Sequence, residues 1–467
     1  MKTAALILAA GQGKRMRSAL PKVLHPVGDE PLVVHVVKLA ITRRCSPIVV
    51  VIDPNGARVR ELLVARFPKA PLVFATQHQA LGTGDAARVG LAAIPKFKGR
   101  VLILCGDVPM LQPTTLAALE KAKGRTSLAV LTARVPDPTG YGRIVRTAAG
   151  TGVERIVEHR DATPAELDIH EINAGVYVVD EALLRRAVRG LSANNDQGEL
   201  YLTDVVPLAA ASGGARAHVV EDAREVRGVN TRVELAEAEA TYRERLVRGH
   251  QLEGVTFRDP TSVLLGARAK IGGDAIIGVG VQLLGSVEIG AGARVEGPSV
   301  LENCTIAPGA VVESFSHIDG AYVGPGAHVG PYARLRPGAQ LGEGARVGNF
   351  VEVKKSRLGK GVKANHLAYL GDAEIGEGTN VGAGTITCNY DGVNKHPTRL
   401  GAGVFVGSNT TLVAPVEVGD GAYVAAGSTV TKNVPADALA FGRARQENRE
   451  GYAKRLRAMQ KRGKAKH

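Results

Sequence analysis

Tryptophan is absent from this chain of 467 residues, and aromatic residues make up only 4% of it. Glycine, in contrast, is abundant, with 57 residues. Few large aromatic side chains and many glycines favour a repetitive β architecture with tight corners, because glycine allows backbone turns that other residues resist. The apolar fraction of 45% and the charged fraction of 22% are ordinary for a globular protein and exclude a disordered chain.

Cysteine is also scarce. Cys45, Cys105, Cys304 and Cys388 lie far apart and form no C-x-x-C pair. The sequence therefore indicates neither a disulfide framework nor a zinc site, and it favours a reducing, cytoplasmic location. No apolar run approaches the roughly 20 residues that a membrane-spanning helix needs. The apolar start ends in a Gly-x-Gly loop followed by basic residues, so we expect a buried first strand rather than a signal peptide.

Acidic residues are outnumbered by basic ones, and the net charge is +14. Residues 443–467 contain ten Lys or Arg and two Glu. A basic tail of this kind can bind nucleic acid, but Tyr452 is its only aromatic residue for base stacking. We favour a solvated C-terminal helix and expect neither a nucleic-acid nor a membrane partner.

The first 230 or so residues alternate between strand-like and helix-like stretches. This alternation is typical of a doubly wound (Rossmann-like) α/β fold, with helices on both faces of a mostly parallel sheet. We expect strands at 4–9, 48–52, 101–104, 127–132 and 174–179, and helices such as 32–42 and 58–67. The proline-free stretch 232–252 predicts one amphipathic helix. The predicted domains are therefore 1–232 and 254–467, joined by a linker helix over 233–253.

The second half carries a six-residue period. Aliphatic residues recur at positions 271, 277, 283, 289, 295 and 301, again from 323 to 353, and again from 400 to 430. Each hexad predicts one short strand and a corner, with the aliphatic side chain inside a prism of stacked coils. The pattern predicts a parallel β-helix. It breaks between Val381 and Leu400, where TCNYDGVNKHPT predicts an excursion loop; a plain surface loop is the alternative.

The motif LAAGQGKRM at 8–16 follows the first predicted strand. Backbone N–H groups of such a glycine-rich turn can surround phosphate oxygens. Followed by PKVL, it resembles the sugar-nucleotide pyrophosphorylases. The motifs QALGTGDA, LILCGDVP, GYGRIV, IVEHRDA, EINAG and GVN follow in the order expected for that family.

The segments GNFVEVKKSRLGKG, HLAYLGDAEIG and NVGAGTITCNYDG resemble the hexapeptide acyltransferases. The combination resembles the bifunctional N-acetylglucosamine-1-phosphate uridylyltransferase/glucosamine-1-phosphate N-acetyltransferase family. This resemblance implies acetyl transfer from acetyl-CoA to glucosamine 1-phosphate, followed by uridylyl transfer from UTP that releases pyrophosphate. It further implies that the product is a precursor of peptidoglycan and lipopolysaccharide. The resemblance also implies a left-handed β-helix and a homotrimer with acetyl-CoA between subunits.

In nucleotidyl transfer the phosphate charge must be neutralised, which calls for a divalent metal and cations. Asp107 follows an apolar strand, at the sheet edge where such sites form. The resemblance implies Mg²⁺ held by Asp107 and Asn230, and phosphate oxygens held by Arg15 and Lys22. It further implies nucleotide contacts from Leu8, Ala9, Ala10, Gly11, Gln77, Gly82 and Thr83, and sugar contacts from Gly142, Glu158 and Asn173.

Acetyl transfer needs a base, because only the free amine attacks a thioester. Histidine titrates near neutral pH, and the resemblance makes His366 the catalytic residue. It also implies that Arg336 and Lys354 hold the sugar phosphate, that Tyr369 and Asn380 hold the sugar, and that acetyl-CoA meets Ala383, Asn389, Tyr390, Ser408, Ala426 and Arg443. Cys388 has no activating neighbour in the sequence, and we expect it to be structural.

Three positions depart from the family pattern. Lys14 and Ala80 stand where threonine and glutamine are common, and Asn365 replaces a common glycine before His366. Two other functions stay open from the residues alone. One is a monofunctional sugar-nucleotide pyrophosphorylase with a structural β-helix, and the other is a nucleic-acid-binding scaffold that uses the basic tail.

Overall fold

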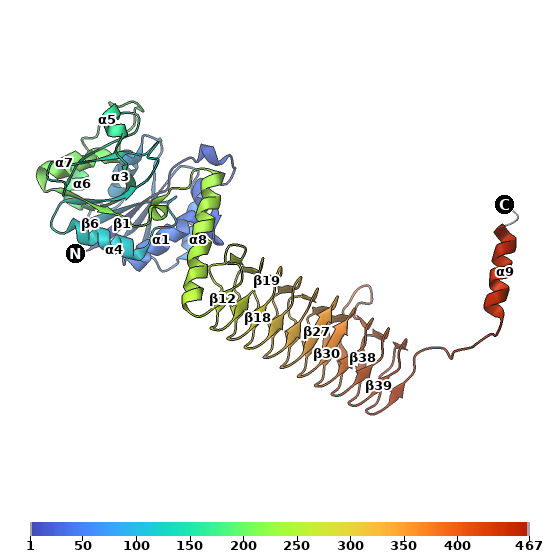
Figure 1. Ribbon diagram of the computed structural model, residues 1–467. Helices are drawn as coiled ribbons and strands as arrows, with labels where there is room; N and C mark the ends of the chain where they lie inside the picture. The colour runs from blue at the N-terminus through green and yellow to red at the C-terminus, as the bar shows by residue number, and fades with distance from the viewer. Residues whose placement is uncertain (1, 465–467) are drawn as a thin grey trace. The chain divides into compact units, whose positions relative to one another are not determined.

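The structure is a computed structural model that describes residues 2–464. The chain divides into two compact units, Met1–Leu246 and Val247–His467 (Figure 1). Among the described residues, no helix has the length and hydrophobicity needed to cross a membrane.

The first unit is built on a twisted sheet with strand order β11-β7-β10-β6-β1-β4-β5 and a β8–β9 hairpin beside β10. All pairs along this order are parallel except those of β10, which runs antiparallel to β6 and β7. Its strands are β1 (Thr3–Leu8), β4 (Ile48–Ile52), β5 (Leu72–Thr76), β6 (Arg100–Cys105), β7 (Leu128–Arg134), β8 (Arg143–Arg146), β9 (Val153–Val157), β10 (Glu171–Asp180) and β11 (Ala215–Val219). A small hairpin joins β2 (Pro26–Val27) and β3 (Glu30–Pro31).

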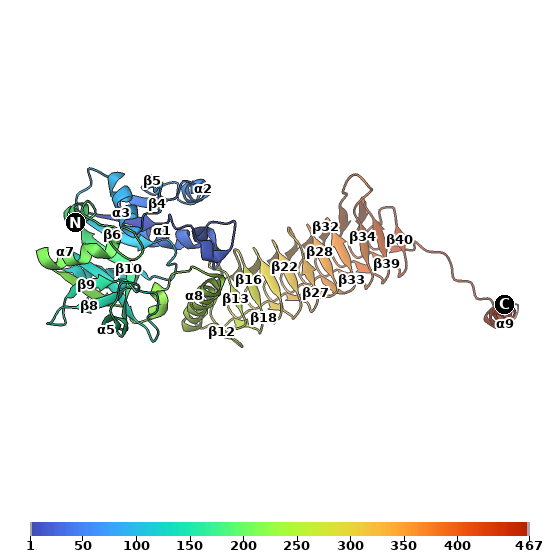
Figure 2. The same ribbon diagram turned by 90° about the horizontal axis from the view of Figure 1, so that it is seen from above.

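Helices cover both faces of this sheet (Figure 2). Every residue of β4 is buried, which explains its uninterrupted apolar sequence. One core contains α1 (Leu32–Thr42), α2 (Ala57–Arg66) and α4 (Pro113–Lys123). The other contains α3 (Thr83–Ala92), α6 (Glu181–Ala187) and α7 (Val205–Ser212). Short helices complete the unit: α5 (Pro164–Leu167), η1 (Lys14–Met16), η2 (Lys22–Leu24), η3 (Leu202–Asp204) and η4 (Ala223–Val226). The doubly wound α/β fold is thus confirmed.

Helix α8 (Arg232–Leu252) forms where the sequence predicts an uninterrupted helix. Thr231 and Glu234 bond to each other at its start in the pattern of a capping box. Within the first unit, Ala238 of α8 is buried in a small apolar cluster with Val27 and Leu32.

The second unit is a parallel β-helix with three sheets, one per side of the prism. The β12 sheet contains β12 (Thr256–Phe257), β15 (Ile276–Ile277), β18 (Arg294–Val295), β21 (Val311–Val312), β24 (His328–Val329), β27 (Arg346–Asn349), β30 (Lys363–His366), β33 (Asn380–Val381), β36 (Phe405–Val406), β39 (Tyr423–Val424) and β41 (Leu439–Ala440). The β13 sheet contains β13 (Leu264–Leu265), β16 (Gln282–Leu284), β19 (Val300–Glu302), β22 (His317–Asp319), β25 (Arg334–Leu335), β28 (Glu352–Lys354), β31 (Tyr369–Gly371), β34 (Ile386–Cys388), β37 (Thr411–Val413) and β40 (Thr429–Val430). The β14 sheet contains β14 (Lys270–Ile271), β17 (Glu288–Ile289), β20 (Thr305–Ile306), β23 (Tyr322–Val323), β26 (Gln340–Leu341), β29 (Arg357–Leu358), β32 (Ala373–Ile375), β35 (Thr398–Leu400) and β38 (Val416–Val418).

The aliphatic residues of the three predicted hexad runs are all buried, which confirms that they fill the prism. The breaks in the period have a simple cause, because some coils are one residue shorter than three hexads. Leu283 pairs with Leu301, which is a step of three full hexads. Leu301 then pairs with Ile318, which is one residue less than three hexads, so this coil is one of the shorter ones.

One coil is much longer than the rest, because Ile375 of β32 pairs with Leu400 of β35. The additional residues leave the prism as a loop closed by an antiparallel bridge between Tyr390 and Lys395. The predicted excursion loop is therefore present.

The basic tail ends in helix α9 (Tyr452–Lys464). Every residue from 441 to 461 is exposed, which agrees with the predicted solvated helix.

Candidate active sites

The glycine-rich loop follows β1 and lies against Lys22. Gly13 has a φ of +60°, and a β-carbon there would come within 2.6 Å of Cβ of Lys22. Only glycine accepts both the left-handed backbone and this approach without strain. The loop continues into η1, which carries the exposed side chain of Arg15. Lys14 is exposed on the same short helix, so the departure from threonine places its charge at the surface.

Lys22, Asp107 and Asn230 come together although they are far apart in the sequence. The Lys22 Nζ donates to Asp107 Oδ2 at 2.5 Å and to Asn230 Oδ1 at 3.1 Å. Asp107 lies just beyond β6, and its carbonyl accepts a hydrogen bond from the Val229 N–H at 2.9 Å. The three polar side chains therefore converge at the carboxyl end of the parallel strands.

This cluster has two oxygen atoms that could hold a divalent cation. Asp107 Oδ2 and Asn230 Oδ1 both approach one atom, Nζ of Lys22, so the two oxygens face a common position. Carboxylate and amide oxygens are ligands that suit Mg²⁺. Within residues 2–464, no group of three or more His, Cys, Asp and Glu residues could hold a metal ion. The chain would thus supply two oxygen ligands, and phosphate oxygens and water would supply the others.

A cavity of about 270 Å³ opens beside the cluster. It is lined by nine of the predicted residues, from β1, the glycine-rich loop, η2, the β5–α3 segment and the end of β6. Its full lining is Leu8, Ala9, Ala10, Gly11, Gln12, Lys22, Val23, Gln77, Ala80, Gly82, Thr83, Ala86, Cys105, Asp107 and Glu199.

Gln77 holds the segment that contains Gly82 and Thr83. Its Nε2 donates to the Gly82 carbonyl at 3.1 Å and to Asp85 Oδ2 at 2.9 Å. On the other side, the Gly84 N–H donates to the Leu200 carbonyl at 2.8 Å. The contact with residue 200 explains why Glu199 reaches the cavity. Glu199 is not among the predicted residues, because its segment carries no periodic or motif signal.

Gly142, Glu158 and Asn173 form a second group in this unit. The Asn173 N–H donates to the Gly142 carbonyl at 2.9 Å, and a β-carbon on Gly142 would lie 3.4 Å from Glu158 Oε2. Glu158 Oε1 accepts a hydrogen bond from the Thr203 hydroxyl at 3.1 Å. Burial raises the pKa of Glu158; the Thr203 bond acts in the opposite direction, and nearby carboxylates add to the rise.

In the second unit, His366 lies at the corner between the β12 and β13 sheets. Its Nδ1 is 2.8 Å from Oδ1 of Asn349, the residue paired with it on the adjacent coil. An amide oxygen only accepts, so Nδ1 is the donor of this hydrogen bond, and in the neutral ring Nε2 is the acceptor. Asn365 lies in β30 and does not adopt a positive φ. The departure from glycine therefore leaves ordinary strand geometry before His366.

Two basic residues come from the β13 sheet and the excursion loop. The pKa of Lys395 in the excursion loop is lowered, chiefly by a hydrogen bond from and repulsion by Lys354 of β28. Two ammonium groups held together favour an anion between them. Lys395 is a second residue that the sequence analysis missed, although its loop was singled out. Arg336, in contrast, donates to Glu352 Oε1 at 2.9 Å.

Tyr369 and Asn380 do not meet in one chain. Tyr369 occupies an outward position of β31 in the β13 sheet, whereas Asn380 occupies an outward position of β33 in the β12 sheet. The predicted sugar contacts thus lie on two sides of the prism. The side chain close to Tyr369 is that of Asn389, since a β-carbon on Gly371 would contact both Tyr369 and Asn389.

The residues expected to contact acetyl-CoA form two groups. Ala383, Ser408 and Ala426 are stacked at the His366 corner, where the Asn409 N–H donates to the Ala383 carbonyl at 2.7 Å and the Gly427 N–H to the Ser408 carbonyl at 2.8 Å. A β-carbon on Gly427 would lie 3.6 Å from Cδ of Arg443. The other group is in the excursion loop. There Asn389 donates to Asp372 Oδ2 at 2.5 Å, while the Tyr390 ring is exposed.

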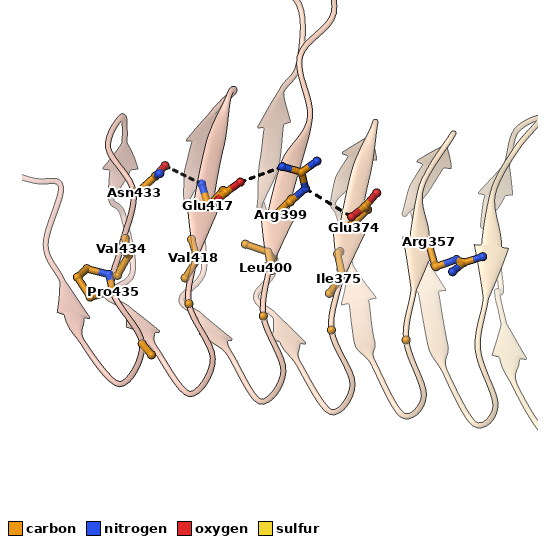
Figure 3. A pocket seen from close by; sticks show the side chains of 15 residues that line it. Arg357, Glu374, Ile375, Arg399, Leu400, Glu417, Val418, Asn433, Val434 and Pro435 are labelled. Carbon is orange, nitrogen blue, oxygen red and sulfur yellow. Dashed lines mark hydrogen bonds and ion pairs between the residues drawn. The ribbon is translucent and has the colours of Figure 1, made fainter.

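Another cavity, of about 850 Å³, is lined by none of the predicted residues. It is a groove along the repeated corner beside the β14 sheet (Figure 3). Arg399 pairs with Glu417 at 2.9 Å and with Glu374 at 3.5 Å, and the Glu417 N–H donates to Asn433 Oδ1 at 2.9 Å. Arg399, Glu374 and Glu417 thus pair with one another across stacked coils, whereas Arg357 of the same groove donates to Gln340.

Comparisons with known proteins agree with this division. A family model described as Nucleotidyl transferase matches residues 4–226. A model described as Bacterial transferase hexapeptide (six repeats) matches residues 320–355 and 397–432. Such repeats, together with three parallel sheets, agree with a left-handed β-helix.

The chain is also similar to whole proteins that carry the name Bifunctional protein GlmU. The one from Anaeromyxobacter dehalogenans (strain 2CP-1 / ATCC BAA-258) is 50% identical over 97% of this chain and 93% of that protein. The one from Sorangium cellulosum (strain So ce56) is 48% identical over 97% of this chain and 96% of that protein. The one from Acinetobacter baumannii (strain AYE) is 45% identical over 97% of this chain and 98% of that protein.

Proposed function

The chain belongs to the family of bifunctional GlmU proteins, and on that premise we propose the following two steps for its two units. The β-helix transfers an acetyl group from acetyl-CoA to glucosamine 1-phosphate. The α/β unit then transfers a uridylyl group from UTP to N-acetylglucosamine 1-phosphate and releases pyrophosphate. The observation that carries the proposal is that Lys22, Asp107 and Asn230, from three distant motifs, converge in the α/β unit, while His366 lies in the separate β-helix.

In the α/β unit, Asp107 and Asn230 would hold Mg²⁺, which supplies charge neutralisation on phosphate oxygens when bound. The backbone of the glycine-rich loop and the ammonium of Lys22 lie beside the same cavity and would bind the triphosphate. Arg15 would add a second cation from η1. Gly142, Glu158 and Asn173 would orient the sugar, with its phosphate toward the α-phosphorus of the nucleotide.

In the β-helix, His366 Nε2 would accept the proton that the glucosamine nitrogen loses as it attacks the thioester carbonyl. The C–N bond forms, and the C–S bond breaks to release coenzyme A. Asn349 would favour the neutral tautomer whose Nε2 carries the free lone pair, and would fix the orientation of the ring, because it bonds the opposite ring nitrogen. Lys354, with Arg336 and Lys395, would hold the sugar phosphate.

One incubation tests the complete proposal. The protein, glucosamine 1-phosphate, acetyl-CoA, UTP and Mg²⁺ should together yield UDP-N-acetylglucosamine, coenzyme A and pyrophosphate. Omission of acetyl-CoA should stop product formation, and pre-acetylated sugar phosphate should restore it. A protein that uses the acetylated substrate but never releases coenzyme A would instead be a monofunctional pyrophosphorylase. Similarity over 97% of the chain to proteins named bifunctional favours the two-step scheme.

We also propose a homotrimer with acetyl-CoA between subunits. Phe315, Tyr332, Phe350 and Leu367 stand at successive corners with positive φ angles between 46° and 62°, and each is 48–59% exposed. Large side chains rarely adopt this strained backbone, and the ring centroids of the first two are 4.8 Å apart. A packed second copy would cover this row and would explain why Tyr369 and Asn380 face different sides. Sedimentation equilibrium should give three times the chain mass, and Tyr332→Lys should lower it.

A cytoplasmic location and a role in supplying precursors of peptidoglycan and lipopolysaccharide follow from the same proposal. Nucleic acid has no part in it. The basic tail, as an isolated peptide, should show no salt-sensitive retention on immobilised DNA or RNA beyond that of a scrambled peptide of equal charge. Specific retention would revive the scaffold alternative.

A further inference from the structure

The start of helix α8 contacts the backbone of Asn230. Glu234 Oε2 accepts hydrogen bonds from the Asn230 N–H at 2.7 Å, from the Thr231 N–H at 2.7 Å and from the Thr231 hydroxyl at 3.1 Å. The Glu234 N–H in turn donates to Thr231 Oγ1 at 3.2 Å. One carboxylate oxygen therefore binds the N-terminal end of the helix and also the residue just before it.

The segment 229–231 is thereby held from two sides. The Val229 N–H donates to the carbonyl of Asp107 at 2.9 Å, and the next two N–H groups donate to Glu234. The Asn230 side chain leaves this fixed backbone and bonds through Oδ1 to Lys22, beside Asp107 Oδ2. The distance between the two oxygens thus depends on where the backbone of Asn230 is held.

We propose that Glu234 is a positioning residue of the metal site. It fixes the backbone of Asn230 so that Oδ1 faces Asp107 Oδ2 at the separation a divalent cation needs. The inference rests on the proposed function, because it assumes that Asp107 and Asn230 hold the metal. Groups that orient metal ligands from outside the coordination shell contribute about 10–100-fold to metal affinity.

The chain contains a matched control for ordinary helix capping. At α5, Glu166 Oε2 accepts from the Thr163 N–H at 2.9 Å and from the Thr163 hydroxyl at 2.8 Å. This is the same capping box, but the residues it holds are not among the proposed metal ligands. Loss of either cap should lower stability, whereas only loss of the Glu234 cap should weaken metal binding.

The experiment measures Mn²⁺ binding to the full chain in the presence of UTP, by the loss of the free Mn²⁺ signal in electron paramagnetic resonance. Glu234→Ala should weaken binding about 10–100-fold, and Glu166→Ala should not change it. Glu234→Gln keeps an acceptor at the same reach and should stay within about threefold of the parent, because a capping box accepts Gln as well as Glu. Thermal unfolding without metal records the purely structural cost of each change.

Unchanged Mn²⁺ binding by folded Glu234→Ala would overturn the inference. If Glu234→Ala does not fold, Glu234→Asp tests the same point, because its carboxylate is one methylene too short to reach the Asn230 N–H. Mn²⁺ binding by Glu234→Asp that equals that of the parent would also overturn the inference. Asp107→Ala separates this failure from that of the proposed function. If Asp107→Ala binds Mn²⁺ as the parent does, the metal site lies elsewhere and both fail together.

Discussion

Asp107 is the residue on which the proposed uridylyl site depends most directly. Asp107→Ala should abolish uridylyl transfer, because it removes the one carboxylate of the proposed metal pair and leaves Lys22 without its 2.5 Å partner. Acetyl transfer, for which we propose no metal, should stay close to that of the parent. The two rates are measured separately, as pyrophosphate and coenzyme A release. Full uridylyl transfer by the folded variant would remove Asp107 from the metal site.

His366 is the corresponding residue in the β-helix. His366→Ala should lower the acetyl-transfer rate on the order of 10²–10⁴-fold, the usual contribution of a general base. Acetyl-CoA binding should change little, because the proposed coenzyme contacts at Ser408, Ala426 and Arg443 are on other coils. The measurement is single-turnover acetyl transfer against pH, with uridylyl transfer as the control for folding. A fall of less than about threefold would make His366 structural.

Glu158 gives a prediction about pH and stability. Its pKa is raised from the ordinary value of 4.5 in the folded chain, chiefly by burial. The folded state therefore binds the proton of Glu158 more tightly than the unfolded state does. This difference adds to the free energy of unfolding below pH 4.5, and the contribution is lost as the pH rises through the pKa of the folded state. Glu158→Gln removes that loss. It should raise the unfolding midpoint of the α/β unit by a few degrees at pH 8 and by less at pH 4.5, since about 1 kcal/mol shifts a domain of this size by ~2–4 °C.

The measurement for Glu158 is scanning calorimetry at both pH values. The same variant should bind the acetylated sugar phosphate more weakly, because an amide replaces a carboxylate acceptor. An equal change of midpoint at pH 8 and pH 4.5 would contradict the electrostatic explanation and would leave only a change in packing.

At the scale of elements, the sequence predicted the helices and strands whose bounds depend on a local pattern of apolar residues. Strand β4 and helix α1 have the predicted bounds, because an apolar run and a 3.6-residue period each mark one element. The direction of β10 was beyond such reasoning. Its apolar sequence is that of a buried strand of either orientation, and only its pairing with β6 and β7 makes it antiparallel.

The candidate sites show the same limit. Lys22, Asp107 and Asn230 could be identified from sequence motifs. That these three side chains come together depends on the order of strands in the sheet, which no motif contains. Lys395 and Glu199 were missed, since each reaches its site through a loop whose path follows from tertiary contacts. The shorter coils could not be read from the period either, because they appear in the sequence only as a break.

The excursion loop is an element that the prism itself does not need. Ile375 pairs with Leu400 on the next coil, and deletion of 391–397 would restore the three-hexad spacing of neighbouring coils between these two positions. We expect the shortened β-helix to fold, because the paired strands and buried aliphatic residues are retained. Acetyl transfer should fall at least tenfold, since Lys395 is lost and Asn389 and Tyr390 lose their support. Circular dichroism and coenzyme A release give the two readouts; an active deletion variant would show that the loop is a plain surface loop.

At the scale of the whole molecule, the two activities should be separable. The contacts divide the chain at residues 246 and 247, and every proposed nucleotidyl residue precedes this point while every proposed acetyl residue follows it. A truncated chain that ends at Gly249 keeps both cores of the α/β unit and the α8 contacts with Val27 and Leu32. It should therefore convert UTP and pre-acetylated sugar phosphate to UDP-N-acetylglucosamine.

The truncated chain should release no coenzyme A when it is given acetyl-CoA and glucosamine 1-phosphate, because it lacks His366 and the whole coenzyme corner. Asp107→Ala in the same short chain supplies the control, since it should remove the remaining activity without unfolding the unit. Coenzyme A release by the folded short chain would place acetyl transfer in the α/β unit and contradict the assignment of both sites. A folded short chain without uridylyl transfer would mean instead that the first site needs residues from the β-helix, which the positions of the proposed residues do not predict.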